Sequence, residues 1–594
     1  MPETASSLHQ LLERYRVTSQ TERSKGTRFE ELAKVYFEED ELQRQFFDEV
    51  DFYADWAKKH GRSMNDTGID LVARIDDGKG GDTLGYCAIQ CKFYARDHVI
   101  QKSDIDSFFS ESGKKPFTQR IIIDTTEVPY GKNAQAAFEN QNIPTARISL
   151  SQIAQSRIDW AQYLEKRKVT FHEKKSPREH QQEACEAVKD AFELGQDRGK
   201  LIMACGTGKT YTALHIVEEL IASREEGGTV LYLVPSLSLM SQTVTEWKND
   251  AKEYFTAFAV CSDSQIGVRK DTEDLGDMES HDLAFPATTH AQTLADKVAD
   301  RPADRKLTIV FATYHSLQVL STAQQKFGMA DFDLIICDEA HRTTGATLAG
   351  QEESNFVAVH DNAFVRADKR LYLTATPRIY DPSVKSKAAE ADATLASMDD
   401  EALFGKVLFH RGFSWAVENN HLTDYKVIVL AMDDGIVSNT VQDRLAKSGG
   451  LNLDDATKII GCYKALTKEN LRVELEHDLS PVRRGLAFCK TIAASKNITA
   501  EFAPVIEEYL SNIDSEADEL VHTLAVREPE AEYGDKNKVP EDPPAPRLNC
   551  ELRHVDGSFK AKERSSLLNW LKDDPDTPDT CRILSNAKCL SEGV

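Results

Sequence analysis

The sequence predicts an α/β protein built from several domains. Short apolar runs recur along the chain between longer stretches whose apolar residues repeat at helical spacing. One of these runs, which begins at Leu201, ends directly in a glycine-rich turn that is followed by Lys209 and Thr210. At 594 residues the chain is also too long for one hydrophobic core. A chain of this length corresponds to about three to five domains.

Composition narrows the class of protein. Apolar residues make up 41% of the chain, and no apolar run reaches the roughly 20 residues that a membrane helix needs. Eleven cysteines without a C-x-x-C pair favour reduced thiols over disulfides or zinc ligands. The N-terminus lacks the pattern of a signal peptide, so we expect a cytoplasmic protein with no membrane partner. The net charge of −25 argues against a protein that coats nucleic acid, although a local basic track remains compatible with it.

The segment from Leu201 to Thr210 predicts a phosphate-binding loop. Its glycines allow a tight turn that points backbone amides at a triphosphate, and Lys209 neutralises the β and γ oxygens. The hydroxyl of Thr210 can ligate Mg²⁺. Met203 replaces the first glycine of the general pattern, as is common in helicase-type loops. The residues expected to bind ATP here are Gly206, Thr207, Gly208, Lys209 and Thr210.

Two apolar strands downstream end in motifs that fit the same ATP site. The first ends in D-E-A-H, where Asp338 would hold Mg²⁺ through water, Glu339 would orient the water that attacks the γ-phosphate, and His341 would relay to the next motif. The second strand ends in T-A-T. The set resembles the motifs of superfamily 2 helicases. That resemblance implies that Gln181, upstream of the loop, hydrogen-bonds adenine and that Thr374, Ala375 and Thr376 couple hydrolysis to movement.

The last third of the chain resembles a second RecA-like lobe. Its recognisable pieces are a strand at 426–431, the motif IV strand at 484–490, His554 to Gly557, and motif V at 584–593. The chain stops inside motif V, and motif VI, which would supply arginines to the ATP site, is absent. We therefore expect a piece of a longer protein that binds nucleotide but does not hydrolyse it efficiently.

The N-terminal region predicts a second chemical site on strands. Helical spacing over residues 3 to 20 and again from Phe29, with a break at Gly26-Thr27, predicts two packed helices. Three strand-like stretches follow, at 68–74, 85–93 and 120–124. Asp70 and Glu30 can hold Mg²⁺, and Lys92 can stabilise charge at a phosphodiester, with Gln90 on the same strand face as Lys92.

This second constellation resembles the Mrr-like branch of the PD-(D/E)xK nucleases, in which Gln stands where most members have an acid. The resemblance implies catalytic roles for Asp70, Gln90, Lys92 and Glu30, with Asp70 and Glu30 as metal ligands. Two alternatives remain open. The domain could be a nuclease fold that has lost activity, or the residues could belong to ordinary surface strands.

These motifs give a domain plan. We expect a nuclease domain at 1–165, a linker at 166–177, a RecA-like lobe that binds ATP at 178–378, an inter-lobe connection at 379–425 and a truncated second RecA-like lobe at 426–594. The basic linker is most simply a solvated connection, although it could contact phosphates. Within the first lobe, the acidic stretch from Asp271 to Asp304 predicts an exposed insertion.

The order of a Mrr-like nuclease followed by a superfamily 2 motor of the DEAH type resembles the single-polypeptide Type ISP restriction-modification enzymes. That family implies a phage-defence endonuclease that moves along double-stranded DNA with ATP and Mg²⁺ and cleaves when two copies meet. It also implies a later adenine methyltransferase, which uses S-adenosylmethionine, and a target-recognition domain. The alternatives are a Type I or Type III restriction subunit, a repair nuclease-helicase, or an RNA helicase with a non-catalytic N-terminal module.

Overall fold

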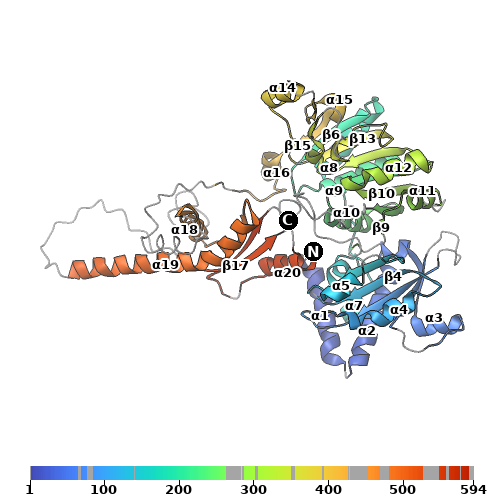
Figure 1. Ribbon diagram of the computed structural model, residues 1–594, viewed down its shortest axis with the longest axis horizontal. Coiled ribbons are helices and arrows are strands. Elements are labelled where there is room, and N and C mark those ends of the chain that lie inside the picture. Colours follow the sequence, from blue (N-terminus) through green and yellow to red (C-terminus); the bar gives the residue numbers. More distant parts are fainter. Residues whose placement is uncertain are drawn as a thin grey trace. The chain divides into compact units, whose positions relative to one another are not determined.

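The protein is seen in a computed structural model that divides into two compact units, residues 1–424 and 425–594. It describes residues 2–19, 21–64, 68–75, 85–126, 128–138, 141–261, 283, 287–300, 306–348, 355–390, 393–425, 427, 453–468, 480–525, 547–556, 559, 561–575 and 577–587. The α/β class with predominantly parallel sheets is confirmed (Figure 1). Among the helices described, none is long and apolar enough to cross a membrane.

A five-stranded sheet forms the first part of the larger unit. Its strands follow chain order, with antiparallel pairing for the first three and parallel pairing for the rest. Ile121 and Ile123 face the core shared with the first two helices, whereas Ile122 faces the opposite core around Trp56 and Phe108. The strands are β1 (Phe47–Phe52), β2 (Leu71–Ile75), β3 (Tyr86–Lys92), β4 (Phe117–Asp124) and β5 (Thr145–Ser149).

The helices around this sheet begin with α1 (Pro2–Thr18) and α2 (Glu22–Glu39). The predicted break at Gly26-Thr27 is wrong, because α2 runs through both residues. The helix begins instead where the hydroxyl of Thr21 accepts a hydrogen bond from the Ser24 amide. The other helices are η1 (Gln43–Gln45), α3 (Tyr53–Lys59), η2 (Lys102–Asp104), α4 (Asp106–Ser112), α5 (Lys132–Ala136), α6 (Leu150–Ala154) and α7 (Trp160–Lys166).

An eight-stranded parallel sheet forms the rest of the unit. Its central strands are buried on both faces, as expected for a parallel sheet covered by helices on each side. The spatial order is β15-β6-β13-β11-β7-β10-β8-β9. In chain order the strands are β6 (Arg198–Met203), β7 (Gly228–Val234), β8 (Phe255–Val260), β9 (Ala287–Thr288), β10 (Leu307–Thr313), β11 (Phe332–Cys337), β13 (Ala367–Thr374) and β15 (Lys406–Arg411).

Helices and a small sheet complete this lobe. The two-stranded sheet pairs β12 (Gly345–Leu348) with β14 (Ala393–Ala396). The helices are α8 (Glu179–Glu193), α9 (Lys209–Val217), η3 (Glu218–Ala222), α10 (Leu237–Asp250), α11 (Ala291–Ala299), η6 (Tyr314–Ser316), α12 (Leu317–Lys326), η7 (Ala340–Thr343), α13 (Asn355–Ala358), α14 (Pro382–Glu390), α15 (Glu401–Phe404) and α16 (Phe413–Glu418).

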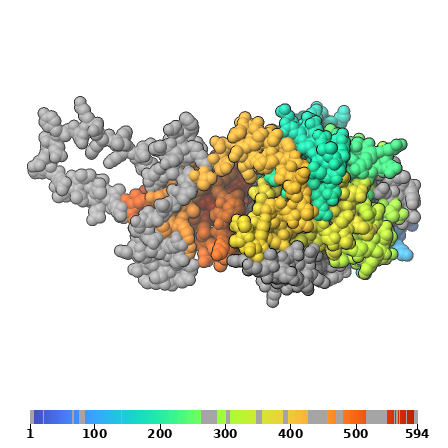
Figure 2. All heavy atoms as spheres, turned by 90° about the horizontal axis from the view of Figure 1, so that it is seen from above, coloured from blue at the N-terminus to red at the C-terminus, as the bar shows by residue number. Residues whose placement is uncertain are grey.

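Two segments of this lobe that were predicted as an insertion and as a connection contain elements that pack on the lobe. Within 271–304, where an exposed insertion was predicted, the described helix α11 instead buries Leu294 and Val298 in the core around α12. Residues 271–282, 284–286 and 301–304 lie outside the described residues. Within 379–425, β15 pairs with β6 as the edge strand of the main sheet. Figure 2 shows the atoms near residue 200, in teal, bordering those of the yellow-to-orange segment that precedes residue 424.

The smaller unit contains a three-stranded parallel sheet in the order β16-β18-β17. Its core joins Ile459 and Val505 on two helices with Ile583 on the central strand. Gly557, residues 588–593 of motif V and the strand predicted at 426–431, apart from the exposed Val427, lie outside the described residues. The elements are α18 (Leu453–Thr467), β16 (Arg484–Phe488), α19 (Ile492–Ala525), β17 (Asn549–Asp556), α20 (Ala561–Lys572) and β18 (Thr580–Ala587).

Candidate functional site

The phosphate loop joins β6 to the N-terminus of α9. Gly206 and Gly208 adopt left-handed backbone angles, with φ of 81° and 88°, which favour glycine. A Cβ atom on Gly208 would lie 2.4 Å from the side-chain amide nitrogen of Gln181, so a larger residue would clash there. Lys209 and Thr210 therefore open a helix whose N-terminal amides can face an anion, as the sequence predicts for a nucleotide site.

Gln181 packs against this loop from α8. Its amide nitrogen lies 3.3 Å from the Thr207 carbonyl oxygen and 3.4 Å from that of Gly208, and its oxygen accepts from the Arg178 amide at 2.8 Å. His180 also reaches the Thr207 carbonyl, at 3.0 Å. In this structure the side chain braces the loop. Its contact with adenine remains a prediction.

The D-E-A-H residues meet the loop at the end of β11. Lys209 Nζ lies 4.0 Å from Glu339 Oε1, although the two residues are 130 positions apart in the sequence. Asp338 is 6% exposed and accepts a hydrogen bond from the Tyr232 hydroxyl at 3.0 Å. Burial, and then the neighbouring Glu339 carboxylate, raise the pKa of Asp338 to about 6, while Lys209 opposes the rise. A buried acid with this balance of charges favours the arrival of a cation such as Mg²⁺.

The third motif connects to the second through His341. Its Nδ1 lies 3.2 Å from the Thr374 hydroxyl, and burial lowers the pKa of His341. Thr374 in turn lies 3.2 Å from both the amide nitrogen and the carbonyl oxygen of Thr376, across Ala375. The structure thus brings the D-E-A-H and T-A-T segments together, while their coupling role remains a prediction.

The second site lies where β2 and β3 meet α2. The Asp70 amide donates to the Ile89 carbonyl at 2.9 Å, and Asp70 Oδ2 accepts from the Cys91 amide at 2.6 Å. Burial raises the pKa of the Cys91 thiol, and the charges of Asp70, Glu30 and Lys92 also act on it. The three predicted charged residues therefore lie close enough to the Cys91 thiol to influence its pKa.

An aromatic stack holds α2 beside this strand. The ring of Phe29 lies 5.3 Å from that of Phe93, centroid to centroid, in a stacked geometry. Phe29 precedes Glu30, and Phe93 follows Lys92, so the stack holds the part of α2 next to Glu30 against the end of β3 next to Lys92. Gln90 is 2% exposed and its amide nitrogen donates to the Gly68 carbonyl at 2.9 Å.

The side-chain oxygen of Gln90 is a candidate metal ligand at this second site. The hydrogen bond to Gly68 fixes the orientation of the amide, and its Oε1 atom is buried with no hydrogen-bond partner. Such an orphaned oxygen is costly unless a cation or water satisfies it. Among the described residues no group of three or more His, Cys, Asp or Glu could hold a metal. A divalent ion here would depend on Asp70, Glu30 and the Gln90 oxygen.

Two other polar clusters are structural. Asp124 lies opposite Lys92 in the strand register, but its carboxylate is taken by Thr126, Tyr130 and Arg147. In the smaller unit, Ser495, His554 and Asp556 form a hydrogen-bonded chain of 2.7 and 2.8 Å. Because Ser495 is fully buried, its hydroxyl cannot act as a nucleophile on a substrate.

Sequence reasoning missed several residues that shape the ATP site. Tyr232 holds Asp338, His180 holds the loop, and the indole nitrogen of Trp247 donates to the Thr210 carbonyl at 2.9 Å. A Tyr in an apolar strand and a Trp on a helix carry no local signal of such a role. The linker lysines were also missed as packing residues, since Lys175 pairs with Asp250 at 2.7 Å.

Family comparisons match the two parts separately. A family described as "Restriction endonuclease" matches residues 38–170, and one described as "Type III restriction enzyme, res subunit" matches residues 174–379. Glu30 lies before the first match, whereas Asp70, Gln90 and Lys92 lie inside it. The nuclease-like domain is thus followed by a helicase lobe in the order that the sequence predicts.

Several known proteins are similar to this pair of domains or to one part of it. A solved structure of the ATP-dependent Type ISP restriction-modification enzyme LlaBIII bound to DNA is 34% identical, with a TM-score of 0.75, over 96% of this chain and 34% of that chain. A probable helicase of African swine fever virus is 32% identical over 39% of this chain and 22% of its own length. The EcoAI Type I endonuclease subunit of Escherichia coli is 26% identical over 44% and 25%.

The chain spans about a third of the length of LlaBIII and about a quarter of the curated relatives. Within that span, the likeness to LlaBIII covers both the nuclease-like domain and the helicase lobes. With its match to a restriction-endonuclease family, its match to a restriction-enzyme res-subunit family and this likeness over nearly its whole length, the chain is similar to a part of the Type ISP restriction-modification enzyme LlaBIII.

Proposed function

We propose that this chain forms the nuclease and motor of an ATP-dependent restriction endonuclease that moves along double-stranded DNA and cuts it. The observation that carries the proposal is the presence, in one compact unit, of two separate constellations. One is the Lys209–Glu339–Asp338 site, and the other is the Asp70–Gln90–Lys92 site with Glu30 beside it. LlaBIII, to which this chain is similar, was solved bound to DNA, and this supports the choice of nucleic acid.

The motor residues would divide the work on ATP. Lys209 would bind the β and γ oxygens, and Thr210 with Asp338 would hold Mg²⁺, which neutralises charge that develops on the phosphates. Glu339 would orient the attacking water. His341 would connect this step to Thr374 and Thr376, and so to movement on DNA.

The nuclease residues would act on a phosphodiester. Asp70, Glu30 and the Gln90 oxygen would hold Mg²⁺, which supplies Lewis-acid activation of water and phosphate when bound. Lys92 would stabilise the negative charge of the pentavalent transition state. This assignment gives a role to the buried Gln90 oxygen, for which the described residues provide no hydrogen-bond partner.

The resemblance to Type ISP enzymes also implies further properties, which we include in the proposal. They are cleavage by two copies of the enzyme on one DNA, a cytoplasmic location, and an adenine methyltransferase and target-recognition domain in a further part of the protein, with S-adenosylmethionine as methyl donor. We attach no residue of this chain to them.

The test uses the complete enzyme that contains this chain. We expect ATP hydrolysis to be stimulated by long duplex DNA, and linear or nicked products to accumulate only with both ATP and Mg²⁺. Duplex RNA of the same length serves as the matched polymer. Stimulation by RNA alone would favour an RNA helicase, and cutting without ATP would indicate a nuclease that works independently of the motor.

A further inference from the structure

Helix α10 contacts the ATP site at both of its metal-binding motifs. Trp247 is fully buried near the end of the helix, and its indole nitrogen donates to the carbonyl of Thr210. The Trp247 ring also packs edge-on against Tyr232, at 4.9 Å between centroids. The Tyr232 hydroxyl donates to Asp338. Trp247 is therefore linked to both residues proposed to hold Mg²⁺, directly to Thr210 and through Tyr232 to Asp338.

The two residues that follow Trp247 contact the nuclease domain. The ammonium group of Lys248 donates to the side-chain oxygen of Gln45, and also to the Phe255 carbonyl at 2.7 Å. The side-chain amide of Asn249 donates to the Gln155 carbonyl at 2.8 Å. Three consecutive residues of one helix therefore join the ATP site to the nuclease.

On the nuclease side, Gln45 lies between the elements that carry the two proposed metal-binding carboxylates. It ends η1, which connects α2, the helix of Glu30, to strand β1. Immediately after β1, the Tyr53 amide donates to the Asp70 carbonyl at 2.9 Å. A displacement of η1 would therefore move the helix that carries Glu30 at one end and, through β1 and Tyr53, the backbone of Asp70 at the other.

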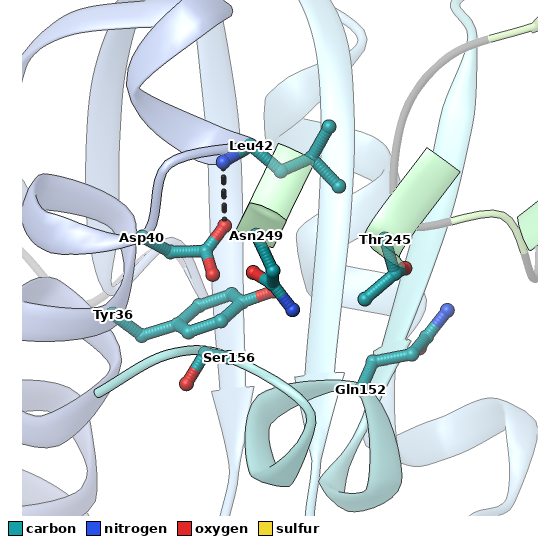
Figure 3. Close-up of a pocket in the computed structure, with 7 residues that line it drawn as sticks. All are labelled: Tyr36, Asp40, Leu42, Gln152, Ser156, Thr245 and Asn249. Carbon is teal, nitrogen blue, oxygen red and sulfur yellow. Dashed lines mark hydrogen bonds between the residues drawn. The ribbon is translucent and has the colours of Figure 1, made fainter. Parts of the chain in front are cut away.

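The contact between the domains includes polar side chains and two small cavities beside the apolar core that the domains share. Figure 3 shows Thr245 and Asn249 of α10 facing Asp40 and Tyr36 across a small cavity. A second small cavity beside Lys248 is lined by charged and polar residues as well as by Phe255.

The linker anchors the same end of α10 to the ATP-binding helix. Lys175 pairs with Asp250, the last residue of α10, and its backbone carbonyl accepts a hydrogen bond from the Tyr211 hydroxyl at 2.6 Å. Tyr211 follows Lys209 and Thr210 on α9. The end of α10 is therefore fixed to the phosphate loop by two routes, through Trp247 and through the linker.

We propose that Lys248 and Asn249 are positioning residues that transmit the state of the ATP site to the nuclease through Gln45 and Gln155. This inference rests on the proposed function, because it assumes a motor and a nuclease that work in sequence. The change that accompanies nucleotide binding at Thr210 and Asp338 shifts Trp247. The adjoining hydrogen bonds then carry that shift to η1 and so to the two carboxylates of the nuclease.

The test measures DNA-stimulated ATPase, its KM for ATP, and DNA cleavage in the complete enzyme. Gln45→Leu removes the acceptor for Lys248, Gln45→Glu retains an acceptor, and Asn249→Asp removes the donor to Gln155. We expect Gln45→Leu and Asn249→Asp to keep the kcat and KM of the ATPase. Cleavage per ATP hydrolysed should fall roughly tenfold, the scale of one lost hydrogen bond. Gln45→Glu should cut nearly as well as the wild type.

Two control substitutions exclude a general loss of stability. Gln242→Ala removes a hydrogen bond to Glu246 on the exposed side of the same helix, and Arg44→Ala changes the exposed neighbour of Gln45. Both should leave cleavage per ATP unchanged, and all variants should melt near the wild-type temperature. The inference is overturned if Gln45→Leu and Asn249→Asp keep the wild-type ratio, or if Gln45→Glu is as defective as Gln45→Leu. If the wild type itself shows no ATP-dependent cutting, the proposed function fails instead.

Discussion

The ATP site and the nuclease site differ in how far the chain itself completes them. In the ATP site, Lys209 faces Glu339, His341 lies beside Thr374, and Tyr232 donates to Asp338, so residues from distant strands already contact one another. In the nuclease site the amide oxygen of Gln90 is buried without a partner. The described contacts therefore hold the proposed motor site together, whereas the proposed nuclease site keeps a buried oxygen that a bound cation would satisfy.

The largest effect should come from the ATP site, because both activities are expected to depend on it. Lys209→Ala removes the charge on the β and γ phosphates and should abolish ATP hydrolysis and DNA cleavage together, by on the order of 10³ or more. Plasmid cleavage and phosphate release, measured on the same preparation of the complete enzyme, check this. Cutting at the wild-type rate would show that the nuclease does not wait for the motor.

The nuclease site should respond alone when it is changed. Asp70→Ala removes a carboxylate from the proposed metal ligands and should abolish cleavage, while DNA-stimulated ATPase stays near normal. The same two assays measure it, and Lys209→Ala is the reciprocal control. If the variant still cuts, the phosphodiester chemistry lies elsewhere in the protein.

The unsatisfied oxygen of Gln90 allows a smaller and more specific test. Gln90→Met has a similar length but supplies no amide oxygen, so the Mg²⁺ concentration needed for half-maximal cleavage should rise about 10- to 100-fold. The metal-free variant should be no less stable than the wild type. It loses the bond to Gly68, but it also loses a buried polar atom without a partner. An unchanged Mg²⁺ requirement would remove Gln90 from the ligand set.

The stability of the folded protein should depend on pH through Asp40, which lies at the contact between the two domains. Burial raises the pKa of Asp40 from its ordinary 3.8 to about 6, although the amides of Gln43 and Leu42 oppose the rise. Because the folded pKa is the higher one, the unfolded chain loses this proton first, and stability falls as pH increases from about 4 to 6.

Asp40→Asn keeps an acceptor for both amides and removes the charge. It should raise the free energy of unfolding at pH 7 by up to about 3 kcal/mol, at about 1.4 kcal/mol for each pKa unit. The gain should be smallest below pH 4, where Asp40 is protonated in both states. Urea unfolding of variant and wild type at pH 4, 5.5 and 7 measures this difference. A gain that does not change with pH would mean that the carboxyl of Asp40 is not responsible.

Much of the fold and of the ATP site could be predicted, because the backbone conformation or burial of a short segment restricts which residues can stand in it. The turn at Gly206 and Gly208 requires left-handed angles, which explains why glycines mark it. Strand β11 ends just before Asp338 and β13 ends at Thr374, and both strands are buried over their last residues, so Leu334 to Cys337 and Leu371 to Leu373 appear as short apolar runs. The alternation of β3 likewise places Gln90 and Lys92 on one face.

Prediction was weaker where neighbours in space decide the outcome. Strands β1 and β5 were not foreseen, since each is a short edge strand stabilised by its partner in the sheet. Gly26 and Thr27 looked like a helix break, but α2 continues through them because Phe29 and Leu32 bury its apolar face in the core. Tertiary packing here outweighs the weak helix propensity of glycine.

The sequence by itself determined the class of fold, the order of nuclease and motor, and the residue types of both predicted sites. Only the tertiary structure decided that Trp247, Lys248 and Asn249 lie between them, with Lys248 in contact with a residue 203 positions away. The physical reason is that a phosphate loop constrains consecutive residues. A hydrogen bond across a domain interface, in contrast, needs only one ordinary polar residue at each end and leaves no pattern along the chain.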